Sequence, residues 1–481
     1  MVEVSAPVLA DIGVVGLAVM GANLARNAAR KGFSVAIYNR HFERTEALLR
    51  AHGAEGRFMP ARSLSDFVAA LAKPRVALIM VKAGAAVDET ITDLLELLEP
   101  DDIIVDGGNS LFSDTARRCK VCAARGVRFV GMGVSGGEEG ALLGPSMMPG
   151  GDRGAYARIA PIITKMAAQV EGRPCCAFIG PEGAGHYVKM VHNGVEYADM
   201  QLIAEAYDLL RTLYGMSAEG IGDIFARWKI GELDSYLVEI SAAVLRKRDA
   251  SGGALVDAIV DEAEQKGTGR WTAQSALDLG VPVTAITEAV FARAVSARRG
   301  QRALAERRFP HAAIAPNRAN SAEIDSVRDA LYASKIVAYA QGFEQMGAAS
   351  AQFGWNLNFG EVATIWRGGC IIRARLLDRI KEGYSADPQL ANLLFGDYFA
   401  DAIIRCESAW RRVVGLAVAN GVAAPAFSSA LAYYDGSRRA RGPANLIQGL
   451  RDYFGAHTYR RLDKPGSFHT RWSQDGSEVE A

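Results

Sequence analysis

The sequence predicts an α/β domain built on a doubly wound parallel sheet at residues 1–183, a large all-helical domain at 184–440 and a C-terminal tail at 441–481. Up to about residue 183, short apolar runs that end in glycine loops alternate with helical segments, as in a parallel sheet covered by helices. From about Gly185 to Tyr434, apolar residues recur at three- and four-residue spacing, which indicates helices. The 481 residues also exceed what one compact core usually holds, and length alone suggests about three domains.

Composition does not favour a nucleic-acid or membrane partner. Lys+Arg and Asp+Glu both total 54, so the net charge is zero, and no apolar run is long enough to span a bilayer. The six cysteines lack the spacing of a secreted disulfide framework. We interpret Cys119 and Cys122 as ordinary helix residues, with metal or redox chemistry as the alternative. Because the first residues show no signal-peptide pattern, we expect a protein of the reducing cytoplasm.

The clearest local pattern is a strand, a glycine turn and a helix near the N-terminus. Residues 8–15 are strand-like, and a helical segment and a second strand at 33–38 follow the turn. The turn itself consists of Gly16, Leu17, Ala18, Val19, Met20 and Gly21. In Rossmann-type domains, backbone N–H groups and the helix dipole hold a dinucleotide pyrophosphate at this place. Ala18 replaces the usual second glycine but is small enough to allow close approach.

The end of the second strand indicates which dinucleotide binds. A carboxylate there usually meets the 2′-hydroxyl of NAD, whereas this chain has Asn39, Arg40 and His41. Arg40 suits a 2′-phosphate by its charge and its bidentate geometry, so we expect NADP. The alternative is an arginine that is merely exposed in a turn.

Three later strands are predicted at 76–81, 103–105 and 127–134, and each ends in a loop of small residues. The loops are Lys82 to Gly84, Asp106 to Ser110 and Ser135 to Gly140. Ligands of open α/β sheets lie beyond the carboxyl ends of the strands, so these loops are expected to line one crevice. A last strand at 176–179 leads into the helical domain.

The segment from Gly183 to Gln201 predicts a helix with polar chemistry on one face. At about 100° per residue, an arc of roughly 140° contains Lys189, His192, Asn193, Glu196 and Tyr197. The lysine and the glutamate could divide proton removal and proton donation if burial moved their pKa values toward neutrality. The alternative is a solvated surface, but the stripe lacks clear i,i+4 Glu-to-Lys pairing. The glycines that precede the helix suggest a close backbone approach to another group.

Two later segments hold further candidates. Gln265 to Trp271 resembles a phosphate cradle, in which glycines expose backbone N–H groups and Lys266 and Thr268 add a charge and a hydroxyl; by itself it is also compatible with an ordinary loop. Arg293 carries no independent signal. The tail around Arg451 and His457 is too rich in aromatic residues to be disordered, so we expect it to pack, with only about residues 473–481 free.

With these residues assembled, the sequence resembles the decarboxylating 6-phosphogluconate dehydrogenases over nearly the whole chain. The matching motifs are GLAVMG at 16–21, VKAG at 81–84, DGGNS at 106–110, GVSGGEEGA at 133–141, KMVHNGVEYADMQL at 189–202, QKGTG at 265–269, WRGGCIIR at 366–373 and RDYFGAHTY at 451–459. The resemblance implies that Lys189 is the general base on the C3 hydroxyl of 6-phosphogluconate while hydride passes to NADP. Carbon dioxide then leaves without a metal, and Glu196 protonates the enediol to give ribulose 5-phosphate.

The resemblance also implies which residues meet each ligand. For NADP they are residues 16–21, Asn39, Arg40, His41, Val81, Lys82, Ala83 and Asn109. For the hydroxyls and carboxylate of the sugar acid they are Asn109, Ser135, Gly136, Gly137, His192 and Asn193. For the phosphate they are Tyr197, Lys266, Thr268 and Arg293, joined by Arg451 and His457 from the partner subunit of a homodimer. The implied setting is the oxidative pentose phosphate pathway and gluconate utilisation.

The chain departs from the family pattern at three places. His41 stands where threonine is usual, which leaves the strength of the NADP preference open. Arg270 stands where lysine is common, and Leu111 and Phe112 replace a more polar pair.

Two other functions remain as alternatives. A β-hydroxyacid dehydrogenase acting on a smaller acid would need Lys189 but not Lys266, Arg293 and Arg451. A silent NADP-binding protein would bind the cofactor tightly and turn over no sugar acid.

Overall fold

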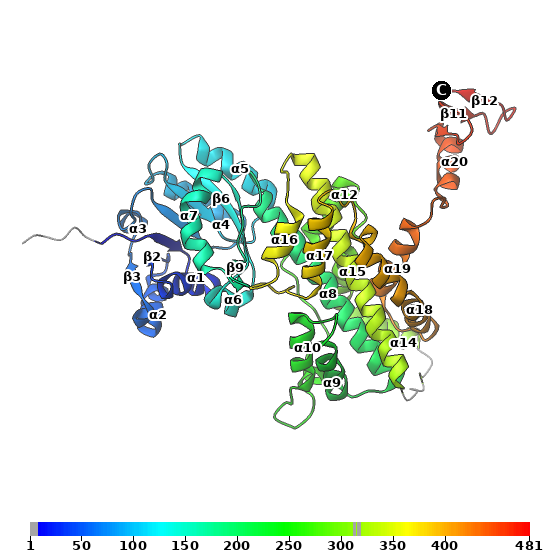
Figure 1. Ribbon diagram of the computed structural model, residues 1–481, viewed down its shortest axis with the longest axis horizontal. Helices are drawn as coiled ribbons and strands as arrows, with labels where there is room; N and C mark the ends of the chain where they lie inside the picture. Colours follow the sequence, from blue (N-terminus) through cyan, green and yellow to red (C-terminus); the bar gives the residue numbers. More distant parts are fainter. Residues whose placement is uncertain (1–7, 311–313, 315–318) are drawn as a thin grey trace, which may run out of the picture. The chain divides into compact units, whose positions relative to one another are not determined.

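The computed structural model describes residues 8–310, 314 and 319–481. They confirm the predicted fold class, a parallel-sheet domain followed by a large helical part and a tail (Figure 1). The described residues contain a seven-stranded sheet of order β3-β2-β1-β4-β5-β6-β7, in which only β7 runs antiparallel to its neighbour. The strands are β1 (Ile12–Val15), β2 (Ser34–Tyr38), β3 (Arg57–Pro60), β4 (Val76–Ile79), β5 (Ile103–Asp106), β6 (Arg128–Val134) and β7 (Met147–Gly151).

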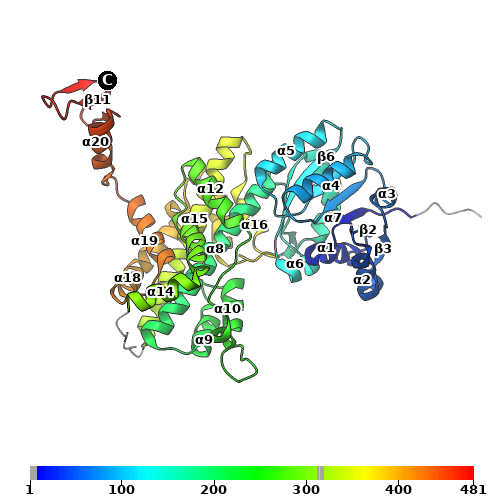
Figure 2. The same ribbon diagram turned by 180° about the vertical axis from the view of Figure 1, so that it is seen from behind.

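Each strand sends alternating side chains into two buried cores, one on either face of the sheet. Val14 and Ile103 belong to one core, and Val15 and Ile104 belong to the other. Burial on both faces explains why these strands read as continuous apolar runs in the sequence. The first core also contains residues of α1, α6 and α7, and the second contains residues of α3, α4 and α5. Figures 1 and 2 show these layers from opposite sides.

The helices of this domain are α1 (Val19–Arg30), α2 (Phe42–His52), α3 (Leu64–Ala69), α4 (Ala85–Leu95), α5 (Phe112–Ala123), α6 (Gly137–Leu143) and α7 (Arg153–Met166), with a 3-10 turn η1 (Gly53–Glu55) and a short hairpin of β8 (Gln169–Val170) and β9 (Arg173–Pro174).

The strands predicted at 8–15, 33–38, 76–81, 103–105 and 127–134 are present as β1, β2, β4, β5 and β6, with some ends shifted. Strands β3 and β7 were not predicted from the sequence. The strand predicted at 176–179 is wrong, because only Cys176 forms a bridge, to Met147. This segment runs beside β7, but Pro149 at the centre of β7 has no N–H to donate, so a regular ladder cannot form.

The helical part is made of α8 (Ala184–Tyr214), α9 (Ala218–Trp228), α10 (Tyr236–Arg246), α11 (Leu255–Ala258), α12 (Thr268–Leu279), α13 (Thr284–Ser296), α14 (Arg299–Arg308), α15 (Ser321–Phe353), α16 (Phe359–Ile365), α17 (Leu376–Ala386), η2 (Leu393–Phe395), α18 (Asp397–Ala419) and α19 (Pro425–Ser437).

The two longest of these helices, α8 and α15, pack against each other. Most residues in the middle of both helices are buried, which explains why neither shows a simple one-sided apolar stripe. A buried ion pair joins them, with Lys335 Nζ 2.6 Å from Asp199 Oδ1. None of the helices in the described ranges has the length and apolar character needed to cross a membrane.

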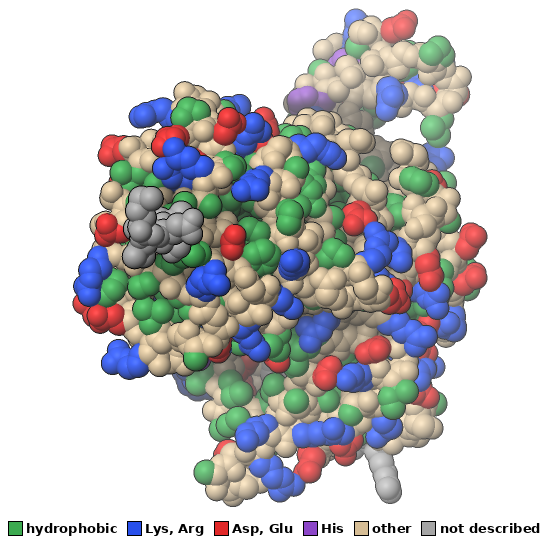
Figure 3. All heavy atoms as spheres, turned by 60° about the vertical axis from the view of Figure 1, so that its left-hand side comes forward, with side chains coloured by type: hydrophobic (Ala, Val, Ile, Leu, Met, Phe, Trp, Pro, Cys, Tyr) green, Lys and Arg blue, Asp and Glu red, His purple; other side chains and the backbone are tan. Residues whose placement is uncertain are grey.

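The chain divides into two compact units, and the division falls at Leu431 within α19. The first unit contains both the sheet domain and the helices that follow it. The predicted domain boundaries at 183 and 440 stay predictions. Basic and acidic side chains are interspersed on the face shown in Figure 3, as the zero net charge suggests.

The C-terminal unit has its own small sheet. It contains α20 (Ala444–Gly455), β10 (Tyr459–Arg460), β11 (Ser467–Thr470) and β12 (Glu478–Glu480). The expectation that residues 473–481 are free is therefore wrong, because β12 pairs with β11. Short polar strands of this kind give little periodic signal in a sequence.

Asp452 is the centre of this unit. Its carboxylate is buried and accepts hydrogen bonds from the backbone N–H groups of Thr458 and Thr470, from the Trp472 indole and from His469. Burial raises the pKa of Asp452, but these hydrogen bonds outweigh burial and lower the pKa to about 2.

Asp452→Asn is expected to loosen the C-terminal unit. The NH₂ group of asparagine would replace a carboxylate oxygen that now accepts hydrogen bonds, so donors would face donors. This change is expected to lower the free energy of unfolding by roughly 1–3 kcal/mol. Because the folded pKa lies below the unfolded value of about 3.9, the stabilisation is present above that pH and is lost as the pH falls toward 2. Hydrogen exchange of residues 456–481 measures the effect, with the exposed Asp463→Asn as control. Equal exchange in both variants contradicts a central role for Asp452.

Candidate active site

The N-terminal half of α8 lies against the ends of β6 and β7, and glycines make this approach possible. A Cβ added to Gly185 would lie 2.3 Å from Met148 O and 2.5 Å from Gly131 O. A Cβ added to Gly133 would lie 2.3 Å from Lys189 Cβ. The glycines before and within α8 thus serve a close contact with the sheet's own backbone, in addition to any contact with a ligand.

This contact buries the polar face that the helical spacing predicts. Lys189, His192 and Asn193 are 6%, 0% and 8% exposed, so the solvated-surface alternative is excluded for them. Lys189 Nζ donates to Asn193 Oδ1 at 2.5 Å and lies 3.5 Å from His192 Nδ1. Glu196 lies one turn further along, with Oε2 3.9 Å from His192 Nδ1, and keeps 22% of its side chain exposed.

Burial shifts the pKa values of the lysine and the glutamate in opposite directions. It lowers the pKa of Lys189, against the charges of Glu196 and Cys370, and raises the pKa of Glu196, against the charges of Lys189 and Arg293. Burial also lowers the pKa of His192 well below its usual value, and the Lys189 charge acts in the same direction. The shifts favour a neutral amine and a protonated carboxyl, the forms that can accept a proton from an alcohol and donate one to carbon.

The loop after β6 completes one side of this cluster. Ser135 is buried, with its Oγ 3.2 Å from His192 Nε2. Gly136 and Gly137 have φ values of +110° and +64°, and a Cβ at Gly136 would lie 2.5 Å from Gly369 O. The loop at 135–137 therefore turns sharply, and it lies between α8 and Gly369, which is distant in sequence.

Sequence reasoning missed the structural neighbours of His192 that lie far along the chain. The Trp366 ring meets the His192 ring edge-on at 5.4 Å between centroids, and Cys370 is fully buried close enough to affect the Lys189 pKa. The WRGGCIIR motif contributes to the resemblance, but no periodicity links it to α8. Only a three-dimensional structure places this motif next to His192 on α8.

Tyr197 continues the face at its other end. Its ring lies between Gly269, where a Cβ would be 2.5 Å from the ring, and the Arg293 guanidinium, whose central carbon is 3.5 Å from the ring centroid. Thr268 begins α12 and is buried, whereas Lys266 is exposed in the loop before it. The structure therefore brings the loop at 265–271 and Arg293 together at Tyr197, a link that the sequence alone did not give.

The glycine turn after β1 has the geometry of a pyrophosphate site. Gly16 has φ +95°, and a Cβ on Gly21 would lie 1.9 Å from Gly16 O, so both positions require glycine. Ala18 precedes α1 and provides no side-chain acceptor, which leaves the first N–H groups of α1 available for an anion. Leu17, Val19 and Met20 complete this turn. Its residues fit a dinucleotide.

The other predicted cofactor residues surround the same edge of the sheet. Leu17 N donates to Asn39 Oδ1 at 3.0 Å, which joins the glycine turn to the end of β2. Arg40 and His41 are exposed just before α2. The exposed Lys82 lies between the half-buried Val81 and Ala83, and Asn109 is exposed between buried Gly108 and Ser110.

Phe112, one of the departures from the family pattern, has a structural explanation. Its ring lies 4.9 Å from Tyr187, 5.6 Å from Phe353 and 6.1 Å from Trp355, measured between centroids. An aromatic side chain at the start of α5 thus packs against α8 and the end of α15. Leu111 is the residue before α5.

Arg451 and His457 lie in the C-terminal unit. Arg451 is exposed on α20 and donates to Gln448, and the His457 ring lies 6.1 Å from the Phe454 ring. Their participation in an active site stays a prediction.

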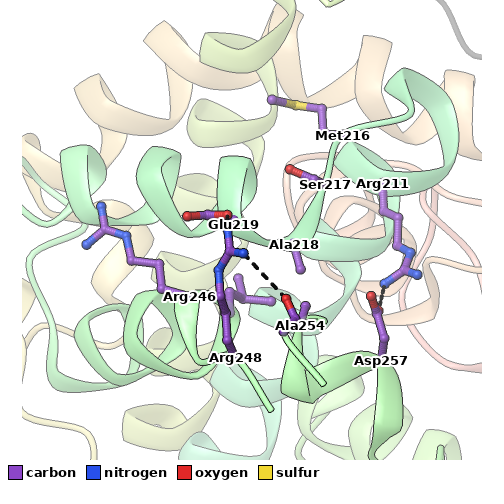
Figure 4. A pocket seen from close by; sticks show the side chains of 11 residues that line it. Arg211, Met216, Ser217, Ala218, Glu219, Arg246, Arg248, Ala254 and Asp257 are labelled. Atoms are coloured by element: carbon purple, nitrogen blue, oxygen red, sulfur yellow. Dashed lines mark hydrogen bonds and ion pairs between the residues drawn. The ribbon is translucent and has the colours of Figure 1, made fainter. Parts of the chain in front are cut away.

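A separate cavity of about 280 Å³ lies at the far end of α8, between α9, α10 and α11 (Figure 4). Its arginines are paired with carboxylates: Arg211 with Asp257, Arg248 with Glu219, and Arg246 with Asp223. With its cations already neutralised, this cavity is a poor match for an anionic substrate.

Comparison with known proteins finds matches to one enzyme family along nearly the whole chain. A family model described as the NAD binding domain of 6-phosphogluconate dehydrogenase matches residues 11–180, and a model of the C-terminal domain of 6-phosphogluconate dehydrogenase matches residues 185–472. The chain is 55% identical to the NADP(+)-dependent, decarboxylating 6-phosphogluconate dehydrogenase of Bacillus subtilis over 465 residues, which cover 96% of this chain and 99% of that protein.

Two further relatives carry the same family name. The decarboxylating 6-phosphogluconate dehydrogenase of Escherichia coli is 52% identical over 463 residues, or 96% of this chain and 99% of that protein. A solved structure of Plasmodium falciparum 6-phosphogluconate dehydrogenase, described in apo form and in complex with NADP+ and with 6-phosphogluconate, matches with a TM-score of 0.94 and 42% identity, covering 96% of this chain and 100% of that chain.

Proposed function

Because the chain belongs to the 6-phosphogluconate dehydrogenase family, we propose that its buried α8 face carries out the family's reaction. The protein is an NADP-dependent oxidoreductase that converts 6-phosphogluconate into ribulose 5-phosphate and carbon dioxide. The observation that supports our assignment of roles is the juxtaposition of Lys189, His192, Asn193 and Glu196, with opposite pKa shifts of the lysine and the glutamate. We place the reaction in the cytoplasm, in the oxidative pentose phosphate pathway and gluconate utilisation.

Lys189 is the proposed base for the first step. Its amine, whose pKa is lowered by burial, removes the proton from the C3 hydroxyl. NADP, held by the glycine turn at 16–21 and by Arg40, would take up the hydride that leaves C3. The resulting ammonium of Lys189 then donates to the new C3 carbonyl oxygen and draws electron density toward it as carbon dioxide leaves. Asn193 and His192 hold the Lys189 nitrogen in place during both steps.

Glu196 is the proposed acid for the last step. Burial raises its pKa, which favours the protonated carboxyl that can give a proton to the carbon that has lost carbon dioxide. Ser135, Gly136, Gly137 and Asn109 are proposed to bind the hydroxyls and the carboxylate of the substrate. Tyr197, Lys266, Thr268 and Arg293 are proposed to bind its phosphate, because a cation and backbone N–H groups converge there.

We also propose a homodimer in which the tail completes the partner's site. One face of α20 is apolar, and its side chains are more than half exposed: Leu446, Ile447, Leu450, Tyr453 and Phe454. Exposed apolar residues at helical spacing are typical of a surface that another chain covers. Arg451 and His457 would then reach the phosphate of the partner's substrate.

The overall reaction is tested with purified protein, 6-phosphogluconate, and either NADP or NAD. We expect NADPH and carbon dioxide in equal amounts. Reduction without carbon dioxide would point to a β-hydroxyacid dehydrogenase that acts on a smaller acid. Tight NADP binding without any turnover would point to a silent binding protein.

Arg40→Ala is expected to weaken NADP binding far more than NAD binding, because only NADP carries the 2′-phosphate that the guanidinium would pair with. Charged hydrogen bonds of this kind contribute about 1.5–3 kcal/mol, or roughly a tenfold to hundredfold change in Kd. Titration of both cofactors measures it, with Arg44→Ala, on the following helix, as control. Equal losses for NADP and NAD would remove Arg40 from 2′-phosphate recognition.

A mixture of two inactive variants tests the catalytic lysine and the shared site together. Lys189→Ala is expected to lose both oxidation and decarboxylation, and Arg451→Ala is expected to lose substrate affinity. After subunit exchange, about half of the dimers are mixed, and each mixed dimer holds one intact site, so roughly a quarter of wild-type activity should return.

Activity that stays at the level of the two variants after subunit exchange would place Arg451 in the site of its own subunit, or in none. Near-normal turnover by the Lys189→Ala variant alone would refute the role of Lys189 as the general base. Light scattering before and after mixing confirms that dimers are present.

A further inference from the structure

The loops that follow β4 and β5 are held together by one buried side chain outside the predicted site. In the described residues, the last backbone hydrogen bond between these strand ends runs from Gly107 N to Ile79 O. Beyond it, residues 81–84 and 108–110 form loops outside the regular ladder. These are the loops to which we assign Val81, Lys82 and Ala83 at the cofactor and Asn109 at both ligands.

Arg118, on α5, bonds to both of these loops. Its side chain is 1% exposed, and all five of its N–H groups have acceptors. On the β4 side, Nε donates to Asp88 Oδ1 at 2.8 Å, and Nη2 donates to Gly84 O at 3.1 Å and Asp88 Oδ2 at 3.2 Å. On the β5 side, Nη1 donates to Ser110 Oγ at 3.1 Å and Asp106 Oδ2 at 3.3 Å.

The acceptors on the β5 side fix the loop that presents Asn109. Asp106 is fully buried and accepts from Ser110 Oγ at 2.6 Å and Gly108 N at 3.1 Å. Asn109, between these two residues, is exposed. The loop is therefore anchored on both sides of the exposed Asn109.

The same helix is also tied to the catalytic helix. Thr115 lies one turn before Arg118 on α5, and its Oγ1 is 2.7 Å from Nδ1 of the buried His186 on α8. His186 lies one turn before Lys189. Helix α5 thus connects α8, the cofactor loop and the substrate loop through the buried side chains of Thr115 and Arg118.

We propose that Arg118 is a positioning residue that sets the distance between the cofactor loop at 81–84 and the substrate loop at 106–110, and so aligns C3 of the sugar acid with the hydride acceptor. The proposal rests on the function proposed above. Hydride transfer is sensitive to such alignment, because a displacement of about 1 Å can cost about a hundredfold in rate. Guanidinium is suited to this task because its planar fork reaches acceptors on two sides at once.

Arg118→Lys tests the proposal. Lysine keeps a positive charge beside Asp106, but one ammonium cannot bond to both loops. We expect kcat to fall by roughly tenfold to a hundredfold, with a larger isotope effect on kcat for 6-phosphogluconate deuterated at C3. The Kd of NADP alone is expected to change less than kcat, because the glycine turn and Arg40 are untouched. Arg117→Lys is the matched control, since Arg117 is exposed and also pairs with Asp88.

Unchanged kcat and isotope effect in a folded Arg118→Lys protein overturn the proposal. So does a parallel loss of thermal stability, NADP affinity and kcat with an unchanged isotope effect, which would indicate a purely structural role. If Arg118→Lys does not fold, Asp88→Asn is decisive: it weakens only the β4 side, and a normal isotope effect there also overturns the proposal. Failure of the wild-type protein to oxidise 6-phosphogluconate is a separate result, which removes the proposed function and this inference with it.

Discussion

The proposed active site depends on how closely α8 approaches the ends of β6 and β7. Gly131, Gly133, Gly150 and Gly185 form a seam in which any added Cβ would lie within 3 Å of a neighbouring atom. Close packing along this seam removes water from Lys189 and His192. Desolvation then lowers the lysine pKa and raises that of Glu196, so a steric property of glycine sets the electrostatic property on which the proposed proton transfer depends.

The surrounding structure holds that helix rigidly. One turn beyond Glu196, Asp199 pairs with Lys335 of α15, and both side chains are almost fully buried. Further along, the Glu205 carboxylate accepts hydrogen bonds from the N–H groups of Ala426 and Phe427 at the start of α19. Buried charged groups of this kind specify one arrangement, because a shifted helix would leave them without partners. The proposed catalytic face therefore lies on a helix that a buried ion pair and hydrogen bonds also hold further along its length.

Much of the fold could be read from local patterns. Strands that are buried on both faces appear as apolar runs, and the turns at Gly16 and Ser135 mark their ends. The polar face of α8 followed from helical periodicity alone, before any question of family. Strand β7 was missed because Met147–Gly151 contains a proline and two glycines, which speak against a strand. The segment at 176–179 looked like a strand because its apolar residues cover that same edge.

The remaining parts of the site depend on contacts that no local pattern records. His192 meets Trp366 across more than 170 positions of sequence, and Tyr197 meets both Gly269 and Arg293. Arg118 gave no signal, since a buried arginine and an exposed one look alike in a helical segment until the packing is known. Phe112 departs from the family pattern in sequence, and the aromatic cluster with Tyr187 and Trp355 explains this departure.

The glycine seam also has a genetic consequence. Every single-base change in a glycine codon that alters the residue either introduces a side chain or ends translation. At Gly133 or Gly185 each such side chain would push α8 away from the sheet, although neither glycine supplies a functional group. Inactivating missense alleles of this gene should therefore gather at positions with no chemistry of their own, where a survey limited to ligand-contacting side chains would overlook them.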